Sequence, residues 1–316
     1  MGSNYRRYID GSSHHVYNRG IEGNIIFYSH WDCILYLTLY YLLGKQYGIT
    51  TWAFCIMPNH VHSNVSAPSY EHFESFHRDL FSKFTLEYNN GHSREGGIFK
   101  RPYGYAPKTY AKRIRENISY ICNNPVVGNI STDIDGYKWN LMVYRATNNP
   151  FSEKIFLREA SNPLRRSIVL LRYYHETGMP LTYVRQRRLF TGLDPNEIKQ
   201  LTDKIISFYN CLDYTAIANI YGGDINNAII AINANTGNEY DIPEDKEDYS
   251  AYYEMLKITS TSGIDLKTCN FEKWPQEKLT KMAHMFSKAG FHKAQIGKFL
   301  HLKREWWRVM HCLPTR

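Results

Sequence analysis

The clearest alternation of apolar and polar positions in the chain follows an apolar run and a short turn. Residues 50–57 are apolar, β-branched or aromatic, which is typical of a buried strand. A proline and an asparagine then favour a turn. Over residues 60–66 successive side chains face opposite sides of a second strand, so His60 and His62 share one face. The pattern predicts two neighbouring strands that carry a pair of imidazoles on a rigid platform.

Helical spacing and a further strand surround this strand pair. Residues 14–18 favour a first strand. Residues 29–44 are dense in leucine, isoleucine and tyrosine, which predicts a buried helix that ends near Gly44. Residues 68–90 place a large apolar side chain at every third or fourth position, the pattern of an amphipathic helix that covers a sheet. This order of strands and helices predicts an α+β fold.

A third helix is expected over residues 109–123, with Pro125 ending it. Its core stripe would consist of Tyr110, Ile114, Ile118 and Ile121. Tyr120 lies about 200° from Ile118 around such a helix, so the pattern does not place it in the core. Asn124 follows one turn later, close to the same side as Tyr120.

Composition indicates the kind of partner and the compartment. Lysine and arginine total 38 against 30 aspartates and glutamates, and the formal charge of +8 favours a polyanion, for which nucleic acid is the first candidate. The six cysteines include no C-x-x-C pair, which indicates a reducing compartment. The first residues lack the apolar core of a signal peptide, and no run of about 18 apolar residues could span a membrane. We therefore expect a soluble cytoplasmic protein with no membrane partner.

Basic and aromatic residues are mixed over residues 94–115. Seven lysines and arginines stand there against one glutamate, with a phenylalanine and three tyrosines between them. This mixture suits single-stranded nucleic acid, because the charges follow the phosphates while the rings stack on bases. An ordinary basic surface hairpin explains the pattern equally well, since Gly96-Gly97 and Pro102 in the same stretch favour a loop.

The second half of the chain is charged and largely helical in pattern. Residues 158–188 hold seven arginines and no lysine, which suits a contact with hairpin DNA or a solvated helical face. Seven acids over residues 239–254 favour a solvated linker. Helices are predicted over residues 279–286, 293–300 and 304–312. They fit either a helix-turn-helix that binds DNA or a small helical bundle around two tryptophans.

Four blocks in the first half of the chain resemble one known family. They are His14, Val16 and Asn18-Arg19-Gly20, then Met57-Pro58-Asn59-His60-Val61-His62, then Tyr120-Ile121-x-x-Asn124-Pro125-Val126, and last Tyr137-x-Trp139. In order and spacing they are similar to the REP-associated tyrosine transposases, which belong to the single-tyrosine HUH transposases, named for histidine, a hydrophobic residue and histidine. The resemblance covers residues 14–145. It implies a ferredoxin-like α+β domain with a central antiparallel sheet.

The resemblance also implies a chemistry, that of a metal-dependent endonuclease and strand transferase acting on single-stranded DNA beside hairpins. Tyr120 would be the nucleophile and form a 5′-phosphotyrosine. His60, His62 and Asn124 would hold Mg²⁺ or Mn²⁺, with the imidazoles favouring Mn²⁺. Without the resemblance, the histidine pair is better explained as two half-buried histidines on a sheet, and Asn124 is equally well a helix cap. A bacterial protein of this kind would associate with the nucleoid.

The chain departs from the family at two places. Ser63-Asn64 stands where the family has apolar residues after the second histidine, and Trp139-Asn140-Leu141 stands where Trp-Ser-Ser is customary. The first departure would leave an extra polar group beside the metal. Both are expected to alter substrate preference more than activity.

These patterns divide the chain into four expected parts. They are an HUH single-tyrosine transposase domain at 1–147, an arginine-rich helical region at 148–240, an acidic linker at 241–272 and a helix-turn-helix-like region at 273–316. The residues expected to contact DNA are Arg19, Lys100, Arg101, Tyr103, Lys108, Arg113, Arg185, Arg187, Arg188, Lys303 and Arg304. A catalytically silent hairpin-binding protein or repressor, and an HUH replication initiator or relaxase, stay open as alternatives. Monomer and homodimer are both open too.

Overall fold

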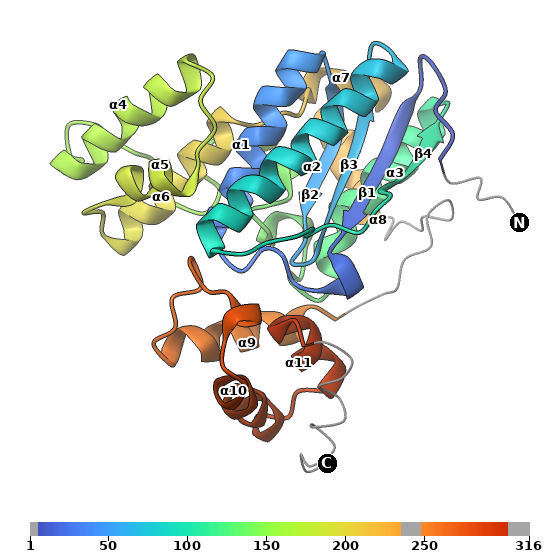
Figure 1. The fold of residues 1–316 in the computed structure, drawn as a ribbon. Coiled ribbons are helices and arrows are strands. Elements are labelled where there is room, and N and C mark those ends of the chain that lie inside the picture. Colours follow the sequence, from blue (N-terminus) through green and yellow to red (C-terminus); the bar gives the residue numbers. More distant parts are fainter. Residues whose placement is uncertain (1–5, 235–247, 303–316) are drawn as a thin grey trace, which may run out of the picture.

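A four-stranded antiparallel sheet lies at the centre of the computed structural model, which describes residues 6–234 and 248–302 (Figure 1). Its strands are β1 (Ser13–Arg19), β2 (Thr50–Ile56), β3 (His60–Ser66) and β4 (Gly104–Lys108). Their order in the sheet is β2-β3-β1-β4. With one helix between β1 and β2 and another between β3 and β4, this is the ferredoxin-like arrangement. The predicted α+β class with a central antiparallel sheet is confirmed.

Helices α1 (His30–Tyr47) and α2 (Tyr70–His92) cover one face of this sheet (Figure 1). Phe54 of β2 packs against Tyr36 and Tyr40 of α1, with ring centroids 6.3 and 4.6 Å away. The fully buried phenylalanines of α2 are Phe73, Phe76 and Phe84. Aromatic side chains of this size bury much apolar surface each, so this layer forms the main core.

Helix α1 ends later than its sequence pattern suggests. Gly44 is buried inside the helix, and the end falls instead at Gly48. Gly48 adopts a φ of 64° and donates its N–H to the carbonyls of Gly44 and Lys45. Glycine enters this left-handed conformation without a Cβ clash, which makes it a common residue just after a helix.

Helix α3 (Ala111–Val127) covers the other face and contacts β2, β3 and β4. The prediction that Pro125 ends this helix after residue 123 is wrong, because Pro125 lies inside the last turn. The N–H groups of Gly128 and Ile130 bond to the carbonyls of Asn124 and Pro125, so the turn closes although proline donates nothing.

The buried stripe of α3 begins later than predicted, because Tyr110 is not part of it. Ile118 and Ile121 are fully buried, as predicted, but Tyr110 precedes the helix and is 54% exposed. The Tyr110 hydroxyl accepts a hydrogen bond from Nε of Arg113 at 3.1 Å. Its ring therefore packs along the surface instead of entering the core.

Eight further helices lie in the described part of the second half of the chain. Helices α4 (Asn162–Glu176), α5 (Tyr183–Phe190) and α6 (Pro195–Phe208) lie beside α1, while α7 (Tyr214–Ile220) and α8 (Ile225–Ala234) contact β2 and α3. Helices α9 (Ser250–Thr261), α10 (Gln276–Lys288) and α11 (Lys293–Leu300) form the C-terminal helical unit, residues 248–302 (Figure 1). Short 3-10 helices occur at Ile21–Gly23, Ile134–Gly136, Leu141–Arg145 and Phe271–Lys273. The predicted helical C-terminal region is confirmed, and no helix of the described residues is long and apolar enough to cross a membrane.

The C-terminal helical unit differs in part from its prediction. Helix α9 lies within residues 241–272, which were expected to be a linker. Its residues Tyr252, Met255 and Thr259 are buried at helical spacing, so at least this part of the segment is packed. Helices α10 and α11 match two predicted helices, whereas the third, at 304–312, lies outside the described residues.

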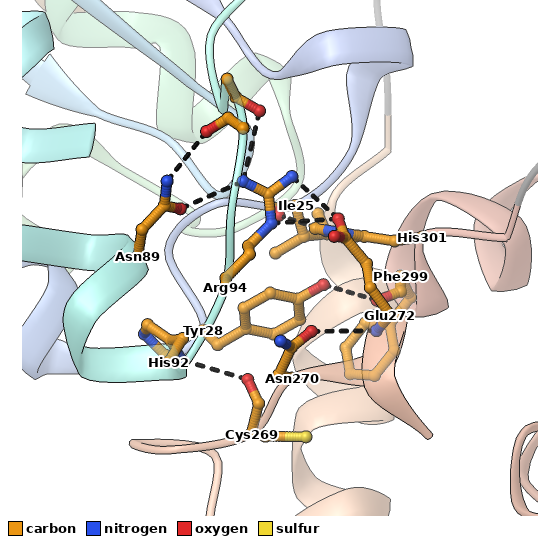
Figure 2. A network of polar contacts seen from close by, with 12 residues as sticks. Ile25, Tyr28, Asn89, His92, Arg94, Cys269, Asn270, Glu272, Phe299 and His301 are labelled. Atoms are coloured by element: carbon orange, nitrogen blue, oxygen red, sulfur yellow. Dashed lines mark hydrogen bonds and ion pairs between the residues drawn. The ribbon is translucent and has the colours of Figure 1, made fainter. Parts of the chain in front are cut away.

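A polar network fastens the C-terminal helical unit to the sheet domain (Figure 2). Arg94 donates to Oε1 of Glu272 from Nη2 at 2.8 Å and from Nε at 3.0 Å. The Nδ1 atom of His301 lies 3.1 Å from the same oxygen, and its Nε2 donates to the carbonyl of Ile25 at 2.8 Å. Tyr28 donates to a carbonyl of α11 at 2.5 Å. We call Arg94, Glu272 and His301 the clasp.

Candidate active site

Strand β3 places His60 and His62 side by side on the sheet face that α3 covers. Their ring centroids lie 4.7 Å apart and the ring planes are nearly perpendicular. The antiparallel register pairs Tyr17 of β1 with His62. The Tyr17 ring lies 5.1 Å from the ring of His62 and 5.5 Å from that of His60. The alternation of β3 thus brings the two imidazoles together on one face, as the sequence pattern predicts.

Tyr120 of α3 lies against this pair. Its ring is edge-on to His62, with 5.7 Å between centroids, and lies 5.6 Å from the ring of His15. Tyr120 is half-buried, whereas His62 is fully buried. The fold therefore joins the predicted nucleophile to the predicted metal ligands, although they are about 60 residues apart in the chain.

Asn124 lies one turn beyond Tyr120 on α3. It is 9% exposed, and its Nδ2 donates to the carbonyl of Tyr120 at 3.1 Å. This bond directs the amide nitrogen back along the helix and leaves Oδ1 as the atom that would meet a cation. The role of Asn124 as a ligand stays a prediction.

Both histidines are neutral at ordinary pH. Burial, the charge of Arg19 and the neighbouring His15 together lower the pKa of His60 to about 3. Burial, His60 and His15 lower the pKa of His62 well below its usual value of 6.5. A neutral imidazole is the form that binds a metal ion.

Three contacts to the histidines were missed by the sequence analysis. Oδ1 of Asn59 lies 2.6 Å from Nδ1 of His60, and the hydroxyl of Tyr249 lies 3.3 Å from the same atom. Nε2 of His15 lies 3.0 Å from Nδ1 of His62. The alternation of β1 places His15 and Tyr17 on one face, but one sequence does not reveal the register between β1 and β3. Nothing in the sequence links Tyr249 to this site.

The donor atoms on this face suit a divalent ion that accepts nitrogen and oxygen. Asn64 is fully buried on the same face of β3, its Nδ2 donates to Asn117 at 2.7 Å, and its Oδ1 has no hydrogen-bond partner. An acceptor in this state is costly unless a donor or a cation meets it. Neutral imidazoles with amide oxygens form a mixed shell that fits Mn²⁺ or Mg²⁺. Within residues 6–234 and 248–302, no three side chains of His, Cys, Asp or Glu form a group that could hold a metal.

Three of the predicted DNA contacts line one cavity between α2 and residues 97–103, the segment that precedes β4. Lys100, Arg101 and Tyr103 line it, and its volume is about 540 Å³. The charged residues that complete its lining are Arg6, Arg78 and Glu74. The guanidinium of Arg6 lies 5.5 Å over the ring of Tyr103. We call this cavity the basic groove.

Other predicted contacts are placed differently. Lys108 is 2% exposed and lies on the α3 face of the sheet, so it is not part of an open DNA-binding surface. Arg19 is half-buried beside His60, close enough to affect its pKa. Arg113 is half-buried and holds Tyr110.

The arginines of α5 divide into two kinds. Arg185 donates from Nη1 to the carbonyl of Pro180 at 2.8 Å and lies over the ring of Tyr174, so it supports the packing of α4 and α5. Arg187 and Arg188 are exposed on the same helix. The remaining predicted contacts, Lys303 and Arg304, lie outside the described residues.

Neither a protein-family model nor a curated protein matches the sequence. Among solved structures, the chain is similar to that of a REP-associated tyrosine transposase bound to a REP hairpin, at 17% identity and a TM-score of 0.37. The similarity covers 43% of this chain and 80% of the transposase. A likeness this distant assigns neither a family nor an activity to the protein.

Proposed function

We propose that the protein is a metal-dependent endonuclease and strand transferase for single-stranded DNA at hairpins, with Tyr120 as its nucleophile. The observation that carries the proposal is the convergence of Tyr120, His60 and His62 from α3 and β3. Phosphodiester transfer to a protein requires a nucleophile, a site for a cation and a rigid scaffold that holds both. The choice of hairpin DNA as the substrate rests on the sequence motifs that resemble the REP-associated transposases.

The proposed reaction conserves the number of phosphodiester bonds. The Tyr120 oxygen forms a bond to phosphorus while the bond from phosphorus to the 3′ oxygen breaks. The phenol proton passes to a base or to water, and the leaving oxygen becomes a 3′-hydroxyl. The 5′-phosphotyrosine keeps the free energy of the broken linkage, so attack by another 3′-hydroxyl rejoins strands without a nucleotide cofactor.

In the proposed reaction Tyr120 attacks the phosphate, and the histidines and Asn124 hold the metal ion. A phenol has a pKa of about 10, so Tyr120 needs a nearby positive charge or a base to react. Mg²⁺ or Mn²⁺, held by His60, His62 and Asn124, would supply that charge and polarise a phosphate oxygen. The sheet fixes the imidazoles, and α3 fixes the ring of Tyr120 against them.

The basic groove supports DNA as the partner. Four of its lining residues are arginine or lysine and only one is acidic, which suits a phosphate backbone. The phenol of Tyr103, in the same lining, offers a ring on which a base can stack. The proposal therefore includes DNA that reaches the α2 side of the sheet.

The test is formation of a covalent protein–DNA adduct. Wild type and Tyr120→Phe are incubated with labelled single-stranded hairpin DNA from the flanks of its own gene, with Mn²⁺ or with EDTA. We expect an adduct with wild type and Mn²⁺ only. Tyr17→Phe and Tyr249→Phe are matched controls, because both tyrosines contact the histidine pair and neither is the proposed nucleophile. An adduct that persists in Tyr120→Phe would assign the reaction to another tyrosine.

A DNA-binding protein that does not cut is the second candidate. The burial of the pair favours it, since His60 is 6% and His62 is 0% exposed. Hairpin binding by wild type without an adduct under any of these conditions would establish this candidate and exclude the nuclease.

A further inference from the structure

The proton on the His60 ring is placed by Asn59. Nδ2 of Asn59 donates to the carbonyl of Gly23 at 2.9 Å, which turns the amide oxygen towards His60. That oxygen can only accept, so Nδ1 of His60 carries the proton. The other ring nitrogen, Nε2, then carries the lone pair.

His15 occupies the corresponding position for His62. It comes from β1, is fully buried, and its Nε2 lies 3.0 Å from Nδ1 of His62. The two rings are stacked, with centroids 5.2 Å apart and planes 26° apart. The ring of Tyr120 contacts His15 as well as His62. His15 therefore packs against side chains of both β3 and α3.

A buried imidazole is an unusual choice for packing alone. Phenylalanine would fill the same space without polar atoms to satisfy, while burial of unsatisfied polar groups costs free energy. The hydrogen bond to His62 is a contact that phenylalanine could not make. In metal sites, a partner on the second ring nitrogen fixes the tautomer and orientation of a histidine ligand.

We propose that His15 is a positioning residue for His62. Its Nε2 accepts a hydrogen bond from Nδ1–H of His62, so that Nε2 of His62 keeps its lone pair. With Asn59 acting in the same way on His60, both ligands offer the same ring nitrogen to one ion. The inference rests on the proposed function for its purpose, whereas the tautomer it assigns can be measured by itself.

The first measurement is the tautomer of His62 in the metal-free protein, read from the ring-nitrogen NMR signals of ¹⁵N-histidine-labelled wild type. We expect the Nδ1–H form. The Nε2–H form in wild type would overturn the inference, and this result does not depend on the folding of any variant.

The second measurement is Mn²⁺ affinity, read from the electron paramagnetic resonance signal of free Mn²⁺. His15→Phe keeps a ring but removes the acceptor, and we expect it to weaken Mn²⁺ binding about 10- to 100-fold. His15→Gln keeps an acceptor oxygen and should stay close to wild type. His14→Phe is the matched control, because His14 faces α2, 5.2 Å from the ring of Phe73.

The outcomes separate this inference from the proposed function. Mn²⁺ binding by wild type that is unchanged in His15→Phe would overturn the role of His15 and leave the nuclease proposal intact. Failure of wild type to bind Mn²⁺ would overturn the metal-dependent function. In that case the tautomer of His62 would still decide the positioning role. An Nδ1–H form in wild type that is lost in His15→Phe would support the role. A tautomer that is the same in both proteins would overturn it.

Discussion

The two central histidines are neutral because they are buried, and this decides what they can do. A protonated imidazole would attract a phosphate directly but would repel a cation, whereas a neutral one can donate a lone pair to a metal. The low pKa of His60, about 3, therefore favours metal binding over direct phosphate binding by this residue. Positive charge for the proposed DNA partner would have to come from elsewhere, and the basic groove offers it.

Removal of two charges from the basic groove should weaken single-stranded DNA binding. Lys100 and Arg101 are exposed at the groove, so each can pair with a phosphate. If both do, the double alanine variant should reduce the slope of log affinity against log salt by about 1.4, since each phosphate that a side chain neutralises adds about 0.7 to the slope. Fluorescence anisotropy with labelled single-stranded DNA over a salt series measures this slope.

The comparison is the double variant Arg187→Ala, Arg188→Ala on α5, the other exposed pair among the predicted DNA contacts. It removes the same charge from another exposed surface. An equal change in both double variants would mean that the whole basic surface binds DNA without a preferred path. An unchanged slope in the groove variant would exclude the groove.

Single residues of the site differ in how far the sequence predicts them. The period of two in β3 gives the shared face of His60 and His62, and the helical period of α3 turns Tyr120 away from the core stripe. The contact of His15 with His62 depends on the register between β1 and β3, which no local pattern encodes. Asn59 is visible only as a turn residue, since its bond to Gly23 depends on the fold of a distant loop.

Among the elements, the three predicted strands and the long helices follow their patterns, whereas β4 and α9 were not predicted and the ends of α1 and α3 were misplaced. Pro125 was expected to end α3, but only one bond is lost where a proline enters a last turn. Helix α9 was hidden because its acidic surroundings dominate the composition of that segment. Tyr252 and Met255 stabilise this helix only when another surface of the protein packs against them, and the sequence does not show that surface.

A buried ion pair joins the helices on the other side of the sheet. Nε2 of His92 on α2 lies 3.0 Å from Oδ1 of Asp32 on α1, and Tyr183 of α5 donates to the same oxygen at 2.5 Å. Nδ1 of His92 donates to the carbonyl of Cys269 at 3.0 Å. Both ring nitrogens face acceptors, which favours the charged form of this imidazole.

The pair predicts a pH dependence of stability. Burial alone would lower the pKa of His92, but the hydrogen bond and charge of Asp32 outweigh it and raise the pKa above 6.5. The stabilisation is therefore complete below about pH 6.5 and is lost as pH rises through the raised pKa. Urea unfolding from pH 5 to pH 9 should show this decline in wild type and not in His92→Gln.

Loss of the acidic partner should be more costly than the pH effect. Asp32→Asn leaves the imidazole without its counter-charge in a buried place, and we expect the free energy of unfolding to fall by about 3–5 kcal/mol. Asp79→Asn is the matched control, since Asp79 lies near the surface of α2 and pairs with the exposed Arg78. A loss of the same size in both variants would contradict a special role for the buried pair.

On the scale of the whole molecule, the C-terminal helical unit contacts the sheet domain at two places, through the clasp and beside the candidate active site. Arg94 and His301 meet Glu272 in the clasp (Figure 2), and Tyr249, just before α9, packs its ring 5.6 Å from that of His60. The unit is therefore packed against the sheet domain beside the candidate active site. Detachment of the unit would remove Tyr249 from the ring of His60, a predicted metal ligand.

The clasp should keep the C-terminal helical unit, and with it Tyr249, in place. Burial would raise the pKa of Glu272, but hydrogen bonds from His301 and Arg94 lower it to about 2. The stabilisation by this carboxylate is thus present above about pH 4.5 and is lost as pH falls through about 2. Because the side chain is 37% exposed, we expect Glu272→Gln to cost about 1 kcal/mol, less than a fully buried pair would.

Hydrogen exchange at neutral pH would locate that loss. In Glu272→Gln, amides of residues 249–302 should exchange about fivefold faster, which corresponds to about 1 kcal/mol of local opening, while the strands stay protected. Glu277→Gln is the matched control, because Glu277 pairs with Lys281 on the exposed side of α10. Equal exchange in the two variants would show that the clasp does not hold the unit. Faster exchange throughout the sheet would show instead that the unit and the sheet domain open as one, which would make the contact of Tyr249 with His60 part of the global fold.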